Sequence, residues 1–182
     1  MSFEQRAAEQ KERFLNNLNK NVKGVPVERI KELFVLLQSE AVSRGLQITD
    51  QGYVAAITHA IGESSIRPTA RGGAGEGGIW QWKGNRANGP DGKPADLSTL
   101  EGNVKHFFYD ASRDSNFLED IQNPDLELHE MVTEGYRYER PSSWFNPKAL
   151  APDPPLNRRS ERDQAGTFRW GVAEDIWEDL TD

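Results

Sequence analysis

One glutamate, Glu63, has a sequence position in which a carboxylic acid could act as a catalyst. Apolar residues recur at helical spacing before it: Tyr53, Ile57, Ala60 and Ile61. Glu63 is therefore expected in the last turn of a buried helix, where unpaired carbonyls and the negative end of the helix dipole favour the protonated acid. An acid that stays protonated near neutral pH can donate a proton to the departing oxygen of a glycosidic bond.

A glycine-rich segment follows this helix. Residues 71–94 hold eight glycines and two prolines, which predicts a loop or a short hairpin. Near its middle, Gln81 stands between Trp80 and Trp82. Tryptophans can stack on sugar faces, and a glutamine can hydrogen-bond hydroxyl groups. We expect this loop to line a cleft beside Glu63, although either tryptophan could instead fill the core.

The order of these motifs resembles that of the lysozyme-like superfamily. The segment 63–70 reads Glu-Ser-Ser-Ile-Arg-Pro-Thr-Ala, and the segment 78–82 reads Gly-Ile-Trp-Gln-Trp. Soluble lytic transglycosylases and phage tail lysozymes carry a similar series. Three later features are closer to the phage tail lysozymes: Gly84 with Arg86, a helix from Leu97 to Tyr109, and the segment 136–141 with Glu-Arg-Pro. The resemblance spans about residues 50–165, and it rests on order and spacing because each motif is short.

The resemblance implies a role for individual residues. Glu63 would be the general acid, Ser64 would hydrogen-bond near it, and Gln81 would lie across the cleft against the sugar chain. From their types, further side chains are candidates for substrate binding, by stacking on sugars or by meeting hydroxyls, acetamides and peptide carboxylates: Trp80, Trp82, Arg86, Tyr109 and Tyr138.

A second carboxylate would decide the reaction. Glu76 is the first choice as catalytic partner, with Asp91 and Asp96 as alternatives. Two carboxyl groups about 5 Å apart suit a nucleophile or an ion-pair stabiliser, and about 6.5–9.5 Å leaves room for an activated water. Glu63 acting alone would fit a lytic transglycosylase, in which the muramyl 6-hydroxyl attacks within the same sugar.

No metal site or cofactor is expected. His59, His106 and His129 are scattered, and no third ligand stands at a convincing spacing. His59 precedes Glu63 by one helical turn, so we interpret it as a core histidine or as a support for the site.

The chain is expected to form one mainly α-helical domain, α+β in the lysozyme-like sense. Residues 1–23 are interpreted as a polar N-terminal arm that docks on another protein, and 24–182 as the catalytic domain. Helices are predicted from Pro26 to Gly45, from about 50 to 63, from 98 to 111 with a capping box at Ser98 to Glu101, from 123 to 140, and from 157 to 180 in one or two pieces. A proline-rich wrap would occupy 141–155.

Composition limits the partners. The net charge of −7 argues against binding to duplex nucleic acid, and no apolar run is long enough to cross a bilayer. The first twenty residues lack the apolar core of a secretory signal. An acidic hydrolase gains no electrostatic steering toward an anionic cell wall, so delivery by a larger particle is favoured.

The resemblance implies a peptidoglycan-degrading glycosidase that cleaves the β-1,4 bond between N-acetylmuramic acid and N-acetylglucosamine. The expected setting is a bacteriophage virion: a tail lysozyme, made in the host cytoplasm, that holds other tail proteins through its arm and opens the wall locally. Hydrolysis is preferred over transglycosylation. A chitinase-like or effector glycosidase is a second enzyme reading, and an inactive tail or baseplate protein on a lysozyme-like scaffold is the rival from another class.

Overall fold

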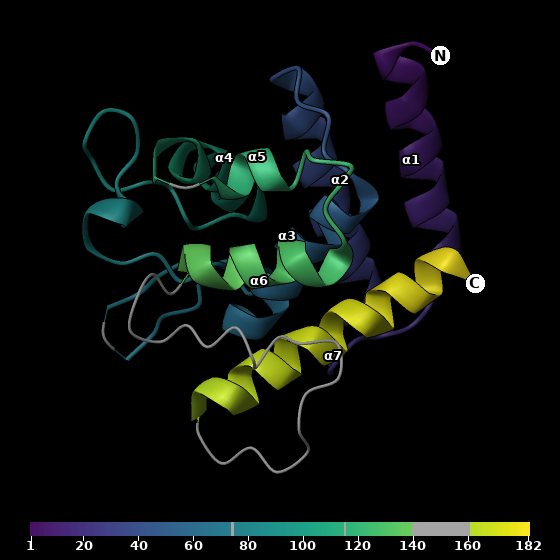
Figure 1. Cartoon of the computed structure of the whole chain (residues 1–182). Helices are drawn as coiled ribbons and strands as arrows, with labels where there is room; N and C mark the ends of the chain where they lie inside the picture. The colour runs from purple at the N-terminus through teal and green to yellow at the C-terminus, as the bar shows by residue number, and fades with distance from the viewer. Residues whose placement is uncertain (74, 115, 140–160) are drawn as a thin grey trace.

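The computed structural model describes residues 1–73, 75–114, 116–139 and 161–182. Within these ranges the chain is mainly α-helical, which confirms the expected class (Figure 1). The elements follow in the order α1 (Phe3–Asn17), α2 (Val27–Ser43), α3 (Asp50–Ser64), the 3₁₀ turn η1 (Gly84–Ala87), α4 (Leu100–Asp114), α5 (Phe117–Asp120), α6 (Leu128–Glu139) and α7 (Glu161–Thr181). In the described residues, β structure is limited to isolated bridges such as Gly77 with Trp82, so the expected hairpin is a loop.

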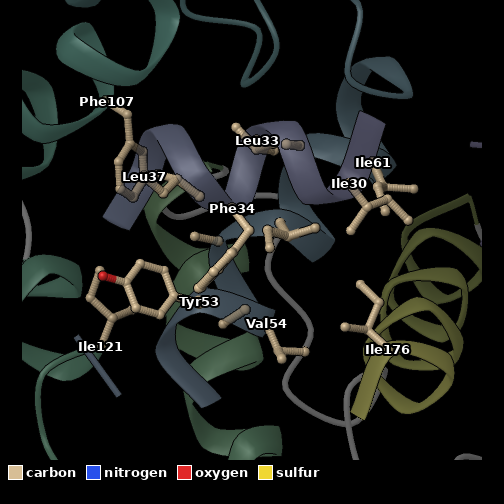
Figure 2. Close-up of a cluster of buried hydrophobic side chains, with 14 of the residues drawn as sticks. Ile30, Leu33, Phe34, Leu37, Tyr53, Val54, Ile61, Phe107, Ile121 and Ile176 are labelled. Atoms are coloured by element: carbon tan, nitrogen blue, oxygen red, sulfur yellow. The ribbon is translucent and has the colours of Figure 1, made fainter. Parts of the chain in front are cut away.

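Helix α3 is the centre of the molecule. Every residue from 52 to 61 is buried, and α2, α6 and α7 pack around it. Figure 2 shows this core, where side chains of α2 such as Phe34 and Leu37 meet Tyr53 and Val54 of α3, with Ile176 of α7 beside them. A helix that is apolar on all sides needs neighbours on all sides. Glu63, in the last turn of α3, therefore lies on the helix that its neighbours enclose most fully.

The N-terminal segment packs on the body of this chain instead of extending as an arm. Phe14 is fully buried and stacks on Phe34 of α2, with ring centroids 4.0 Å apart. Leu18 and Val22 are also buried, and Asn17 donates to the Leu180 carbonyl at the end of α7. The polar composition suggested an arm because only a few apolar residues are available. Three of these, Phe14, Leu18 and Val22, are buried against the rest of the chain, which is sufficient for docking.

The caps of the early helices follow the sequence closely. Pro26 precedes the first turn of α2, and Gly45, with φ of +70°, lies just beyond its end, as predicted. Thr49 caps α3 by accepting from the Gly52 amide at 3.0 Å. The start of α4 differs in detail, because Thr99 accepts from the Gly102 amide while Glu101 pairs with Lys105 at 2.8 Å. The structure thus has a simple N-cap at Thr99 where the sequence predicted a capping box.

The later helices differ more from expectation. Asn123 and Pro124 lie in a turn, and α6 begins only at Leu128. At the start of this helix, the Glu127 amide donates to the Glu130 carboxylate at 2.8 Å. Helix α7 is one continuous helix, although two glycines suggested that it could be two pieces. Ile176 and Leu180 are buried, whereas Trp170 and Trp177 are half-buried. The proline-rich segment 141–155 lies outside the described residues.

Among the residues described, none of the helices combines the length and the apolar character required to span a bilayer.

Candidate functional site

The backbone turns sharply after Glu63. Ser65 and Ile66 both adopt the left-handed conformation, with φ of +53° and +56°. The Ser65 amide donates to the Ile61 carbonyl at 2.9 Å and the Ile66 amide to the Ala60 carbonyl at 3.4 Å, which closes the end of α3. A left-handed β-branched residue is rare and strained. Ile66 is held there by burial in the core, with 1% of its surface exposed.

Glu63 forms a buried ion pair with an arginine from α7. The Nη2 of Arg169 donates to Oε1 of Glu63 at 2.5 Å. The side chains are 8% exposed for Glu63 and 4% for Arg169, so both members of the pair are nearly buried. Our sequence argument considered only the helix end, which favours the protonated acid. The guanidinium opposes that effect because an adjacent cation favours the carboxylate.

His59 supports the arginine from behind. Arg169 Nε lies 3.1 Å from Nδ1 of His59, and Nε2 of His59 lies 2.9 Å from the Val132 carbonyl oxygen in α6. A carbonyl can only accept and an arginine N–H can only donate. His59 is therefore the neutral tautomer with its proton on Nε2. The expectation of a core or supporting histidine fits this position, since the ring is only 1% exposed.

Two glycines provide the space for this cluster. A Cβ added at Gly62 would lie 1.8 Å from Nη1 of Arg169, so the guanidinium crosses α3 directly above that residue. A Cβ at Gly135 in α6 would lie 2.4 Å from Nε2 of His59. Glycines in helix interiors cost stability, about 0.5–1 kcal/mol relative to alanine. Their presence on two helices facing the same cluster marks the arrangement as a built one.

The glycine-rich loop is fastened to the end of α3 through Ile79. Its carbonyl accepts from Oγ of Ser64 at 3.0 Å, and its amide donates to Oδ1 of Asn103 in α4 at 2.8 Å. Ser64 is buried, so its role is to join the loop to the helix that carries Glu63. The resemblance implied that Ser64 hydrogen-bonds near Glu63, and in the structure its hydroxyl donates to the backbone carbonyls of Ala60 and Ile79.

Glu76 and Gln81 meet on the loop above Gly72. A Cβ added at Gly72 would lie 2.3 Å from a carboxylate oxygen of Glu76 and 2.9 Å from Oε1 of Gln81. Gln81 has a left-handed backbone, φ of +53°, and its Nε2 donates to the Gly78 carbonyl at 2.6 Å. Glu76 is 21% exposed and lies 4.0 Å from Nζ of Lys83. The loop thus holds one carboxylate and one amide near each other, above Gly72.

Both tryptophans of the loop belong to the core. Trp80 donates to the Ala56 carbonyl at 3.1 Å and stacks on Phe107, and Trp82 donates to Asp110 at 3.1 Å. They are 3% and 2% exposed. Neither ring offers a face to a sugar in this structure, which corrects their assignment as stacking residues.

Arg86 and Tyr138 belong to a second buried network, centred on Asp110. Arg86 Nη2 donates to Oδ2 of Asp110 at 2.6 Å, and the Tyr138 hydroxyl forms a short hydrogen bond to the same oxygen. The guanidinium also lies 4.5 Å from the centre of the Tyr138 ring. Burial raises the pKa of the Tyr138 hydroxyl, and the Asp110 charge raises it further. The expected substrate-binding roles of both residues are replaced by internal contacts.

Tyr109 lies apart from Glu63, in a groove of about 840 Å³ between α4 and the loop 89–96. Asp91 and Asp96, the alternative second carboxylates, line the same groove, which places them with Tyr109. The Tyr109 hydroxyl accepts from Arg113 at 3.1 Å. Of the predicted site residues, the structure therefore groups Glu63 and Ser64 with the Gln81 loop, and it separates Tyr109 from them.

Sequence reasoning missed Arg169 and Asn103. Asn103 follows the predicted cap Ser98 by five residues, and an asparagine on an apolar helix face is a signal that could have been used. Arg169 is 106 residues from Glu63, and no local pattern connects the two. In the described parts of the chain, no three histidine or acidic side chains are grouped so that they could hold a metal ion.

No family model, curated protein or solved structure was found to match this chain.

Proposed function

We propose that the chain is a peptidoglycan-cleaving glycosidase of the lysozyme-like kind in which Glu63 is the general acid. The observation that carries the proposal is the placement of Glu63: an acid in the last turn of the central helix, beside the glycine-rich loop and held by an arginine. A general acid must be fixed in orientation and still reachable by the bond it protonates.

Backbone strain supports the same location. Within the described residues, four non-glycine residues have positive φ, and three of them are Ser65, Ile66 and Gln81. Each such residue costs of the order of 1–3 kcal/mol, and strain of this kind collects at functional sites. It is concentrated here at the end of the Glu63 helix and at the loop fastened to it.

Hydrolysis is the preferred reaction, and Glu76 is the candidate second carboxylate. It lies on the loop beside Gln81, and Lys83 at 4.0 Å stabilises its charge. Under this proposal Glu63 protonates the leaving oxygen while Glu76 activates water or stabilises the developing cation. The lytic transglycosylase alternative needs Glu63 alone. The chitinase-like or effector glycosidase reading uses the same acid on a related polymer.

The biological setting proposed is a bacteriophage tail, where the protein would open the wall locally. Its support is the acidic net charge of −7, which gives no attraction toward an anionic wall and favours delivery by a particle. Docking on other tail proteins through an N-terminal arm has lost its support, because Phe14, Leu18 and Val22 bury their side chains within this chain.

Mass analysis of the soluble products from purified peptidoglycan tests the proposal. The wild-type protein and Glu63→Gln are compared, with Lys20→Gln as a control that changes a surface charge elsewhere. Reducing muropeptides from the wild type and the control only would establish a muramidase. Anhydro products with the same dependence on Glu63 would establish a transglycosylase. Equal products, or none, from all three proteins would remove Glu63 from catalysis.

A second candidate function is that of a non-catalytic structural or binding protein on the same scaffold. The specific observation in its favour is that Trp80, Trp82, Arg86 and Tyr138 are all committed to internal contacts. This reading predicts that Glu63→Gln changes stability and nothing else.

A further inference from the structure

We propose that Arg169, oriented by His59, is the positioning residue of the Glu63 carboxyl group: it donates to Oε1, so that the proton to be transferred is carried on Oε2. This inference rests on the proposed function of Glu63. It assigns a task to two residues that the motif around Glu63 does not contain, one of them on the last helix of the chain.

The first argument is the geometry of the guanidinium. Its Nη2 donates to Glu63 at 2.5 Å and its Nε donates to His59 at 3.1 Å, so two nitrogens of one rigid plane are fixed. A glutamate side chain has three rotatable bonds and is poorly defined without such a partner. Arginine suits this task better than lysine because its planar fork fixes direction as well as charge.

The second argument is that His59 can accept the hydrogen bond from Arg169 in only one protonation state. Its Nε2 proton is directed at the Val132 carbonyl, 2.9 Å away, which leaves the Nδ1 lone pair for Arg169. A protonated ring would direct an N–H at the Nε–H of Arg169. His59 therefore aligns Arg169 as a neutral acceptor and adds no charge between the guanidinium and Glu63.

The third argument is that neighbouring helices are shaped around the cluster. Gly62 lies under the guanidinium and Gly135 lies against the imidazole, and a Cβ at either position would overlap with them. An ion pair formed by chance on a surface needs no such clearance. The two glycines show that the path from α7 to Glu63 is part of the fold.

The experiment measures kcat and KM on soluble peptidoglycan fragments for the wild type, Arg169→Gln and Arg169→Lys. We expect Arg169→Gln to lower kcat by about 100-fold with KM changed less than threefold, since the substrate does not contact Arg169. Arg169→Lys should recover only part of kcat, because the charge is restored without the planar fork. Thermal unfolding of each variant verifies that it is folded at the assay temperature.

The matched control is Lys20→Gln. Lys20 pairs with Asp179 at 2.8 Å and so also anchors α7 to the body, but it makes no contact with Glu63 in this structure. If Arg169 only anchored α7, the two variants would lower kcat together. Should Arg169→Gln prove unfolded, Gly62→Ala provides a second route, since its methyl group displaces the guanidinium without changing any charge.

A measurement that does not depend on activity accompanies the kinetics. The side-chain carboxyl carbon of Glu63, labelled with carbon-13, should shift in Arg169→Gln and remain in place in Lys20→Gln. An active wild type with unchanged kcat and an unshifted carboxyl signal in Arg169→Gln would overturn this inference alone. An inactive wild type would overturn the proposed function, and a shifted signal would then leave Arg169 as the orienting partner of a non-catalytic Glu63.

Discussion

Among the residues that the structure describes, Glu63 and Asp110 each form an ion pair with an arginine, and the two arginines differ in their burial. At Glu63 the carboxylate is 8% exposed and its partner Arg169 is 4% exposed. At Asp110 the carboxylate is 1% exposed, and its partner Arg86, at 28%, covers it from the solvent side. In the first pair both side chains are nearly buried, whereas in the second a partly exposed arginine covers a fully buried acid.

The difference extends to the helices that carry the two acids. Asp110 lies within α4 and accepts from Trp82, Arg86 and Tyr138, so it binds three elements of the fold together. Glu63 lies in the last turn of α3, next to the left-handed residues that direct the chain into the loop. A carboxylate surrounded by internal donors is suited to stability, and one at a strained helix end is a candidate for chemistry.

The largest expected effect on stability separates the two pairs. Asp110→Ala should lower the free energy of unfolding by about 3–5 kcal/mol, because the Arg86 guanidinium loses its counter-ion while the Tyr138 hydroxyl and the Trp82 N–H lose their acceptor. Urea denaturation measures this loss. Asp110→Asn, which keeps an acceptor oxygen, should cost less. A loss below about 1 kcal/mol for Asp110→Ala would show that the network is dispensable.

Substituting the arginine of each pair tests the same comparison. Arg169→Gln should cost about 3–4 kcal/mol of stability, since both members of its pair are nearly buried. Arg86→Gln should cost less, about 1–3 kcal/mol, because water can reach the space that the half-exposed arginine leaves. Parallel urea titrations decide the order. The reverse order would mean that the burial difference on which the comparison rests has no energetic meaning.

Removing a single hydroxyl group tests the Asp110 network with a smaller expected effect. Tyr138→Phe removes the hydroxyl that donates to Asp110 and keeps the ring that stacks on Phe117. The expected loss is about 1–2 kcal/mol, the usual value for a buried hydrogen bond to a charged group. Activity per folded molecule should not change. A variant that retains stability but loses turnover would move Tyr138 back to the substrate site.

The smallest effect is a pH dependence from His106, which belongs to the Asp110 side. Burial lowers the pKa of His106 below its ordinary value of 6.5, against a raising effect from its hydrogen bond to the Arg86 carbonyl. The unfolded chain therefore binds the proton more readily, so this contribution to stability is complete above about pH 6.5 and is lost as pH falls through the folded pKa. Unfolding free energies at pH 7.5 and 5.5 for wild type and His106→Gln measure it. An equal decrease in both proteins would exclude His106 as the source.

Much of the helical frame could be predicted from local pattern. The buried faces of α2 and α4, the Thr49 cap and the stop at Gly45 follow from spacing and turn chemistry, which act within a few residues. The N-terminal segment was misjudged because composition alone does not show that Phe14 has a stacking partner in Phe34. Docking of an amphipathic helix depends on tertiary contacts that a local reading does not contain.

The candidate site could be predicted only in part, and for the same reason. Glu63 and the Gln81 loop are joined by short sequence distances, and Ser64 fastens them directly. Arg169 enters from α7, across 106 residues. The tryptophans were ambiguous from the start, because an aromatic ring that could stack on a sugar can equally fill a core.

The central claim is that the two carboxylates divide stability from chemistry, and one paired measurement tests it most directly. Turnover of soluble peptidoglycan fragments is measured for Glu63→Gln and Asp110→Asn, each normalised to its folded fraction from urea denaturation. We predict that Glu63→Gln loses several orders of magnitude in kcat per folded molecule, whereas Asp110→Asn keeps kcat within a few-fold and loses stability. Equal turnover per folded molecule in Glu63→Gln and wild type would contradict the account.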